Sequence, residues 1–248
     1  MVKSIRGIAF LASLLCVSIC QAETVTYRLG LSLGGRGMAA GTGVYSENHT
    51  VYNGKDAVQM KMTLTTNKLA DIAFKMRDTI TSVQTLKGEP IQYCKIVNEK
   101  NTHNIETAEF MRSGGKHNVR LLVRNQERVI YDRSESWDEP VYDMLSMLRY
   151  ARGIDATNLS EGDVVKIPMV NGELVVVQHI VFEGRERIKD ERGDKTDCLR
   201  LSVRDYKKGP ERETMKVYVT DDSAHIPVRL DIILGSAVIK AVLNDYTE

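Results

Sequence analysis

The sequence lacks the residue patterns that identify most metal and catalytic sites. No H-E-x-x-H motif is present, and the five histidines are scattered, none of them one helical turn from another. Neither Cys94 nor Cys198 has a second cysteine two residues away, as structural zinc sites usually require. We therefore expect no metal ion, no cofactor and no enzymatic activity. A hydrolase whose catalytic residues meet only in the fold stays an alternative.

An excess of charge of either sign is also missing. The chain has 34 Lys and Arg residues against 33 Asp and Glu residues, which gives a net charge of +1, and it has no basic stripe. Nucleic-acid binding depends on clustered positive charge. We therefore expect no nucleic acid as a partner.

Long hydrophobic runs are absent beyond residue 20, so we expect no transmembrane segment in the mature chain. The one apolar run, Ile8 to Cys20, follows two basic residues and precedes the small residue Ala22. This order is typical of a secretory signal peptide, so we expect residues 1–22 to be removed after Ala22 and the protein to be exported, for instance to a periplasm. An uncleaved anchor and a lipidated cysteine are weaker alternatives. The run is short for a membrane span, and no small residue precedes Cys16 or Cys20.

Two cysteines remain after the signal peptide, Cys94 and Cys198. In an oxidising compartment they could form a disulfide, which would close a loop of about 100 residues. Two separate thiols on different strands are the alternative. We favour the separate thiols, because pairing requires a close approach that the sequence does not indicate.

Alternation of apolar and polar residues dominates the rest of the chain. Such runs predict antiparallel strands with one face on a core, about ten of them here, separated by glycine-containing turns. Asn171-Gly172 is the sharpest hairpin signal, because a type I′ turn needs positive φ at both positions. The clearest apolar series are Val58, Met60, Met62 and Leu64; Leu199, Leu201 and Val203; Met215, Val217 and Val219; and Ile226, Val228, Leu230 and Ile232.

One longer segment has helical periodicity instead. Residues 138–152 place apolar side chains at i, i+3, i+4 and i+7, with Asp138 as the expected N-cap and Trp137 packing on Tyr142. A shorter helical piece is expected from Lys68 to Phe74. A large sheet must curl, close or split. The expected fold class is therefore mainly β: one domain, residues 23–248, in which a large curved antiparallel sheet (a half-barrel) wraps around one central helix.

The stretch LSLGGRGMAAGTGVY, residues 31–45, matches the G-x-G-x-x-A pattern of a dinucleotide-binding loop. Such a loop must open a helix, but Gly41 and Gly43 would fall in its first turns, and the residues around them favour a strand. We therefore expect a strand with a small-residue face, which permits bending or the close approach of another element. Valine at Gly37 or Gly41 is expected to damage folding.

A set of short motifs follows in a fairly specific order along the mature chain. They are Thr66-Asn67 with Phe74-Lys75-Met76-Arg77-Asp78, Tyr142 to Arg149, Glu161-Gly162-Asp163, Val217 to Asp222 with Ile226 to Arg229, and Gly235-Ser236. Together they resemble a family of bacterial envelope proteins, the domain of unknown function 3108. The sequence departs from the family pattern in the closer spacing of Arg149 and in Tyr218, where tryptophan is common.

The resemblance implies an architecture similar to the periplasmic lipoprotein carriers and receptors of the LolA/LolB type. Those proteins are half-barrels with helices over an apolar cavity that holds acyl chains. The resemblance implies no settled activity and no catalytic residues.

We therefore expect a non-enzymatic envelope protein that binds a lipid, a lipoprotein acyl chain or another amphiphile in the concave face of its sheet. Other envelope proteins are a further class of expected partner. Methionine suits variable apolar surfaces, and methionines occur both on a predicted strand and on the helix. The candidate cavity-lining residues are Met60, Met62, Met144, Leu145, Met147 and Leu148. Ordinary core packing is the alternative for each of them, and a scaffold protein with a filled interior is the alternative for the whole chain.

Overall fold

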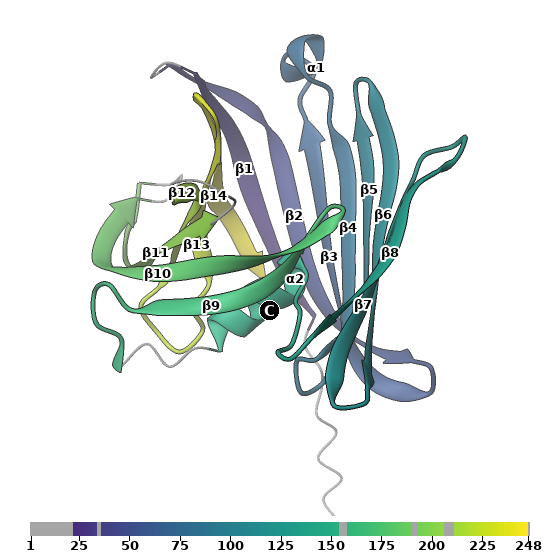
Figure 1. The fold of residues 1–248 in the computed structure, drawn as a ribbon. Coiled ribbons are helices and arrows are strands. Elements are labelled where there is room, and N and C mark those ends of the chain that lie inside the picture. Colours follow the sequence, from purple (N-terminus) through teal and green to yellow (C-terminus); the bar gives the residue numbers. More distant parts are fainter. Residues whose placement is uncertain (1–21, 34–35, 154–157, 190–192, 206–210, 248) are drawn as a thin grey trace, which may run out of the picture.

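A single antiparallel sheet of 14 strands dominates the computed structural model, which describes residues 22–33, 36–153, 158–189, 193–205 and 211–247 (Figure 1). The strands are β1 (Glu23–Leu33), β2 (Arg36–Tyr52), β3 (Lys55–Thr66), β4 (Arg77–Thr85), β5 (Pro90–Glu99), β6 (Thr102–Ser113), β7 (Lys116–Arg124), β8 (Val129–Trp137), β9 (Val164–Asn171), β10 (Leu174–Lys189), β11 (Lys195–Asp205), β12 (Arg212–Thr220), β13 (Pro227–Leu234) and β14 (Ala237–Thr247). The helices in the described residues are α1 (Ala70–Ala73) and α2 (Met144–Arg152). The mainly β class is confirmed, with more strands than the periodicity indicated. The expected signal peptide lies, apart from Ala22, outside the described residues.

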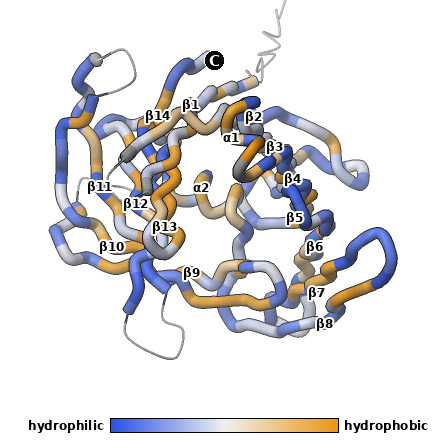
Figure 2. Tube along the Cα trace, turned by 90° about the horizontal axis from the view of Figure 1, so that it is seen from above, coloured by the Kyte–Doolittle hydropathy of each residue, from blue (hydrophilic) through white to orange (hydrophobic). Residues whose placement is uncertain are grey.

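The sheet consists of two antiparallel meanders joined at the strands that begin and end the fold. Strands β1 to β8 follow one another on one side, strands β9 to β14 on the other, and β1 pairs with β14. The edges are therefore β8 and β9, and the connection between them contains α2. Seen from above, α2 lies inside the curve of the sheet (Figure 2). The expectation of a curved sheet around one central helix is confirmed.

A β-bulge in the pairing of β1 with β2 determines which glycines of the stretch lie on the same face of the sheet. The register of β1 with β2 shifts between Leu29 and Gly30, so Gly41 pairs with Leu29 whereas Gly37 pairs with Ser32 on the opposite face. A Cβ atom at Gly41 would lie 2.0 Å from the carbonyl oxygen of Thr65, but at Gly37 it would meet nothing within 4 Å. The stretch is a strand, as predicted. The expected damage from valine is supported at Gly41 and contradicted at Gly37.

Helix α2 begins at Met144, not near Asp138. Trp137 ends β8, and Tyr142 pairs with Met169 in a parallel bridge on the free edge of β9, where the Tyr142 amide donates to the Pro168 carbonyl at 2.9 Å. This extended pairing competes with helix formation, so the helix starts only after it. The ring of Tyr142 contacts Tyr150, with centroids 5.1 Å apart. The predicted helix start, with Asp138 as N-cap between Trp137 and Tyr142, is therefore wrong.

The hairpin predicted at Asn171-Gly172 is present between β9 and β10, but its turn is not of type I′. Asn53 and Gly54 have φ values of 50° and 74°, whereas in the β9–β10 turn only Gly172, with φ 62°, is positive. The two cysteines are separate free thiols on β5 and β11, as favoured from the sequence, and burial raises the pKa of Cys198 to about 11. Within the described residues, no helix is both long and apolar enough to cross a membrane.

Candidate functional site on the concave face of the sheet

The N-terminus of α2 is held on the sheet by a buried carboxylate. Asp143 is fully buried and accepts hydrogen bonds from the amides of Leu145 at 2.8 Å and Ser146 at 3.0 Å. Its own amide donates to the Ser146 hydroxyl at 2.9 Å, which completes a capping box with Ser146. Its second oxygen accepts from the Ser82 hydroxyl on β4 at 2.7 Å. Burial raises the pKa of Asp143, while the hydrogen bonds from Ser146, Ser82 and Leu145 act in the opposite direction. One side chain therefore starts the helix and fixes it to the sheet.

The C-terminus of α2 is fixed by two ion pairs. Glu23 on β1 and Glu47 on β2 lie directly opposite each other, which would be repulsive without neutralisation. The Nη1 atom of Arg152 lies 2.8 Å from both carboxylate oxygens of Glu23, and Nε of Arg149 lies 2.9 Å from Glu47. These groups line an open polar cleft of about 640 Å³. Because both carboxylates are paired with guanidinium groups, the arrangement holds the helix in place.

The helix and the sheet enclose little empty space between them. Of the predicted cavity-lining residues, Met60, Leu145 and Met147 are at most 2% exposed and belong to the packed core. Met62 and Leu148 do line a void, but its volume is about 20 Å³. That is room for about one water molecule.

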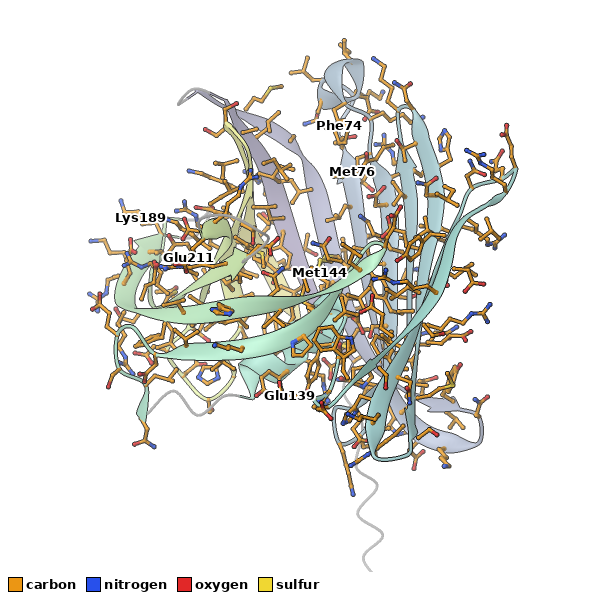
Figure 3. The ribbon with its side chains drawn as sticks, in the orientation of Figure 1. Phe74, Met76, Glu139, Met144, Lys189 and Glu211 are labelled. Carbon is orange, nitrogen blue, oxygen red and sulfur yellow. The ribbon has the colours of Figure 1, made fainter. Side chains whose placement is uncertain are left out.

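The sixth predicted residue, Met144, lies on a part of the concave face that is incompletely covered. It is half-buried at the start of α2, inside the curve of the sheet, and packs against the core (Figure 3). Other half-buried apolar side chains pack against the same core from four further strands. They are Leu31, Leu64, Val165, Met169 and Met215. The alternation in the sequence places such residues on one face of a strand. It does not indicate which of them stay partly exposed in the fold.

One row of residues across β3 to β8 places two charged side chains on the concave face. Residues that pair across neighbouring antiparallel strands lie on the same face of the sheet. The pairing of β3 to β8 therefore places one residue of each strand in a single row on this face. The row is Met62, Ile80, Lys95, Glu106, Val123 and Tyr131. It is apolar on β3 and β4, charged on β5 and β6, apolar again at the buried Val123 on β7, and ends in a tyrosine on the edge strand. The sequence of a single strand does not show this row, because the row depends on which strands pair and in which register.

Tyr131, at the end of this row, has an unused hydrogen-bonding group. Its hydroxyl is buried and has no hydrogen-bond partner among the described residues. The guanidinium of Arg133 lies 5.5 Å from the centre of its ring and is paired with Glu135. Buried polar groups are nearly always hydrogen-bonded, so this hydroxyl is an exception, and it lies below the accessible surface.

Two features that suggest enzymatic or metal chemistry are absent from the described geometry. The letters of Gly30 to Gly34 fit the G-x-S-x-G motif of a nucleophile elbow, but Ser32 lies within β1, paired with both β2 and β14. That motif requires a turn from a strand into a helix. No cluster of three or more His, Cys, Asp or Glu residues suited to a metal ion occurs in the described part of the chain.

Comparison with known proteins identifies the family and the fold. The model of the family "Protein of unknown function (DUF3108)" matches residues 24–243, and the chain belongs to that family. The structure is similar to the crystal structure of a β-barrel-like protein of the domain of unknown function DUF1849 from Brucella abortus, with a TM-score of 0.64. The two share 10% sequence identity over 91% of this chain and 97% of the other, so the likeness concerns the fold alone. No curated protein matches the sequence.

Proposed function

We propose that this member of the DUF3108 family is an exported, non-enzymatic protein that binds an amphiphile on the concave face of its sheet. The observation that carries the proposal is the row from Met62 to Tyr131, in which the apolar Met62 and Ile80 are followed on the same face by the charged Lys95 and Glu106. An acyl chain would cover the half-buried residues near Leu64 and Met144. The polar head would face Lys95 and Glu106, which are paired across β5 and β6.

The size of the enclosed void determines where such a ligand would lie. Ligand pockets usually measure about 300–1,000 Å³, and the void between α2 and the sheet is about 20 Å³. The acyl chain therefore does not fit beneath α2. It would lie over the exposed side of Met144, on the open part of the concave face.

Export is supported by the apolar run Ile8 to Cys20 with its basic start and small residue at Ala22. An exported protein of a cell envelope meets acyl chains in membrane lipids and in lipoproteins. Both sources offer an apolar chain joined to a polar head, which is the chemistry of the proposed face.

Native mass spectrometry of the protein purified from its own host tests the proposal. We expect a bound mass that fragments to an acyl-containing molecule. Leu64→Arg should abolish it, because a charge would stand in the apolar part of the face. Leu86→Arg is the matched control, since Leu86 is 55% exposed in the turn after β4, and it should keep the bound mass. An apo mass for the gently isolated wild type, or equal loss in both variants, would contradict acyl binding.

A scaffold protein without a ligand is the second candidate, and the complete burial of Met60, Leu145 and Met147 favours it. A scaffold needs a stable core and not an open apolar face. In that case Leu64→Arg should leave the host phenotype of the wild type intact while the mass spectrum stays apo.

A further inference from the structure

Helix α1 presents apolar side chains to solvent. Leu69 is 65% exposed, Ile72 is 76% exposed and Phe74 is 43% exposed, all within six residues of the connection between β3 and β4. The helix stands beyond the ends of both strands, well away from α2, and Phe74 lies at the same end (Figures 1 and 3). We name residues 68–75 the α1 knob. Ala70 is buried in the core, but Leu69, Ile72 and Phe74 contribute little to it, so their exposure needs another explanation.

The knob is firmly attached at its base. The amide of Asn67 donates to the Ala40 carbonyl at 2.8 Å, and its side chain donates to the Ala39 carbonyl at 2.9 Å. The side-chain oxygen of Asn67 also accepts from the Ala70 amide at 2.8 Å, which starts the helix. The exposed side chains are thus carried on a fixed support joined to β2.

Contacts from Arg77 and Thr66 close the base of the knob and neutralise the charge of Asp71. Arg77 binds Asp71 through both guanidinium nitrogens, at 3.0 and 2.7 Å, and the Thr66 hydroxyl donates to the same carboxylate. Asp71 is the only acidic residue between Thr66 and Arg77.

Three lysines also lie at this end, beside the half-buried Glu99 and the buried Asp78. Lys68 and Lys75 flank the apolar residues and are exposed, and the exposed Lys100 adjoins them, because its amide donates to the Lys75 carbonyl at 3.0 Å. Within the described residues, none of the three lysines forms an ion pair. Apolar side chains surrounded by lysines are complementary to a surface that is apolar inside and negatively charged outside.

We propose that the α1 knob inserts Leu69, Ile72 and Phe74 into the surface of an anionic lipid bilayer, with Lys68, Lys75 and Lys100 facing its headgroups. Each lysine near such a surface strengthens binding about fivefold at low salt. Three partly inserted side chains add a modest apolar contribution, so the contact is weak and reversible. The proposal does not rest on the concave face holding a ligand.

Vesicle sedimentation tests it, with protein recovered from cells that express the full chain. The vesicles contain either phosphatidylcholine alone or equal parts of phosphatidylcholine and phosphatidylglycerol. We expect binding to the anionic vesicles that falls steeply with added salt, and much weaker binding to the neutral ones. Lys68→Glu with Lys75→Glu should lower the anionic binding at least about 25-fold, from the loss of two favourable charges.

The double variant Leu69→Asp and Ile72→Asp should lower anionic binding at least about 30-fold, because apolar insertion is lost and repulsion is added. Val51→Asp is the matched control: Val51 is 64% exposed, but it lies next to the β2–β3 turn at the opposite ends of those strands. It should bind vesicles like the wild type. Circular dichroism and thermal unfolding should be the same for all variants, because every substituted side chain is exposed.

Two outcomes would overturn the proposal. One is absence of wild-type binding to either vesicle, and a photocrosslink from position 72 to a single protein would then assign the knob to a protein partner. The other is equal loss of binding in Val51→Asp and in the double variant, since charge anywhere on the surface would then be responsible. Recovery of bound lipid in the mass spectrum without vesicle binding would contradict the knob while leaving the proposed ligand untouched.

Discussion

The two helices in the described part of the chain use apolar residues in opposite ways. Helix α2 turns Leu145 and Met147 into the core, whereas α1 holds Leu69 and Ile72 out in solvent. They are also attached differently. Carboxylates and guanidinium groups fix α2 to the sheet at both ends, whereas α1 is joined to β2 through Asn67 and carries one ion pair, between Asp71 and Arg77, at its base.

The difference shows how a nearly all-β chain can place two helices for two purposes. A helix inside the curve must match many neighbours at once, so buried charges that fix its position are useful despite their desolvation cost. A helix at the strand ends needs only a narrow base. Its apolar side chains are then available to a surface outside the protein.

The largest expected effect concerns the base of α1. Gly41→Val should destabilise the fold by at least about 4 kcal/mol or prevent folding, because overlap with the Thr65 backbone cannot be relieved by side-chain movement. Gly37→Val should stay within about 0.5 kcal/mol of the wild type, because its Cβ meets open space. Urea unfolding measures both. Equal stability of the two variants would show that α1 does not depend on this close approach.

The next effect concerns the start of α2. Asp143→Ala removes the helix cap, leaves the Ser82 hydroxyl without its partner and creates a buried void. We expect a loss of about 3 kcal/mol in the free energy of unfolding. Asp71→Ala is the counterpart in α1, where the carboxylate is more exposed, and its shift in melting temperature should be clearly smaller. The reverse order would contradict the view that α2 depends on its carboxylates more than α1 does.

The ion pairs at the end of α2 should contribute somewhat less. Arg152→Met leaves Glu23 facing Glu47 with one cation fewer, in a site where the arginine side chain is only 18% exposed. We expect a loss of about 2 kcal/mol. Arg187→Met, which breaks a pair exposed on both sides, should have no measurable effect. Similar melting temperatures for the two variants would mean that the cleft around Glu23 is not what holds the helix.

A smaller effect should appear in the pH dependence of stability. Burial raises the pKa of Asp143 in the folded state, so its contribution is fully present below the unfolded pKa and is lost as the pH rises through the folded pKa. Asp143→Asn removes this loss and keeps the shape of the cap. The melting temperature of the variant relative to the wild type should therefore increase from acidic to neutral pH. A decrease would show that the hydrogen bonds to the carboxylate outweigh its desolvation.

The smallest expected effect is that of Ile72→Ser on stability. Because Ile72 is 76% exposed, the free energy of unfolding should change by less than about 0.5 kcal/mol. A loss above about 1 kcal/mol in thermal or urea unfolding would mean that α1 contributes to the core after all.

Predictions from the sequence succeeded where a single segment carries the information and failed where a distant segment takes part. The alternation around Met60 and Met62 predicted a strand, and the chain is a strand there. The helix was placed correctly but started too early, because Tyr142 pairs with Met169, 27 positions further along the chain. The cavity assigned to Met60 and Leu145 needed a distance between sheet and helix that no periodicity contains.

By itself, the sequence determined the mainly β class, the central helix, the strand nature of the glycine-rich stretch and the family, because each depends on local periodicity, turn residues or the order of motifs. Only the tertiary structure decided that Gly41 matters and Gly37 does not, that Arg152 meets Glu23 from 129 positions away, and that Met62 and Tyr131 share one face across six strands. The physical reason is register. Each strand fixes which of its side chains share a face, but the pairing of strands, shifted by single bulges, decides which faces and which charges meet.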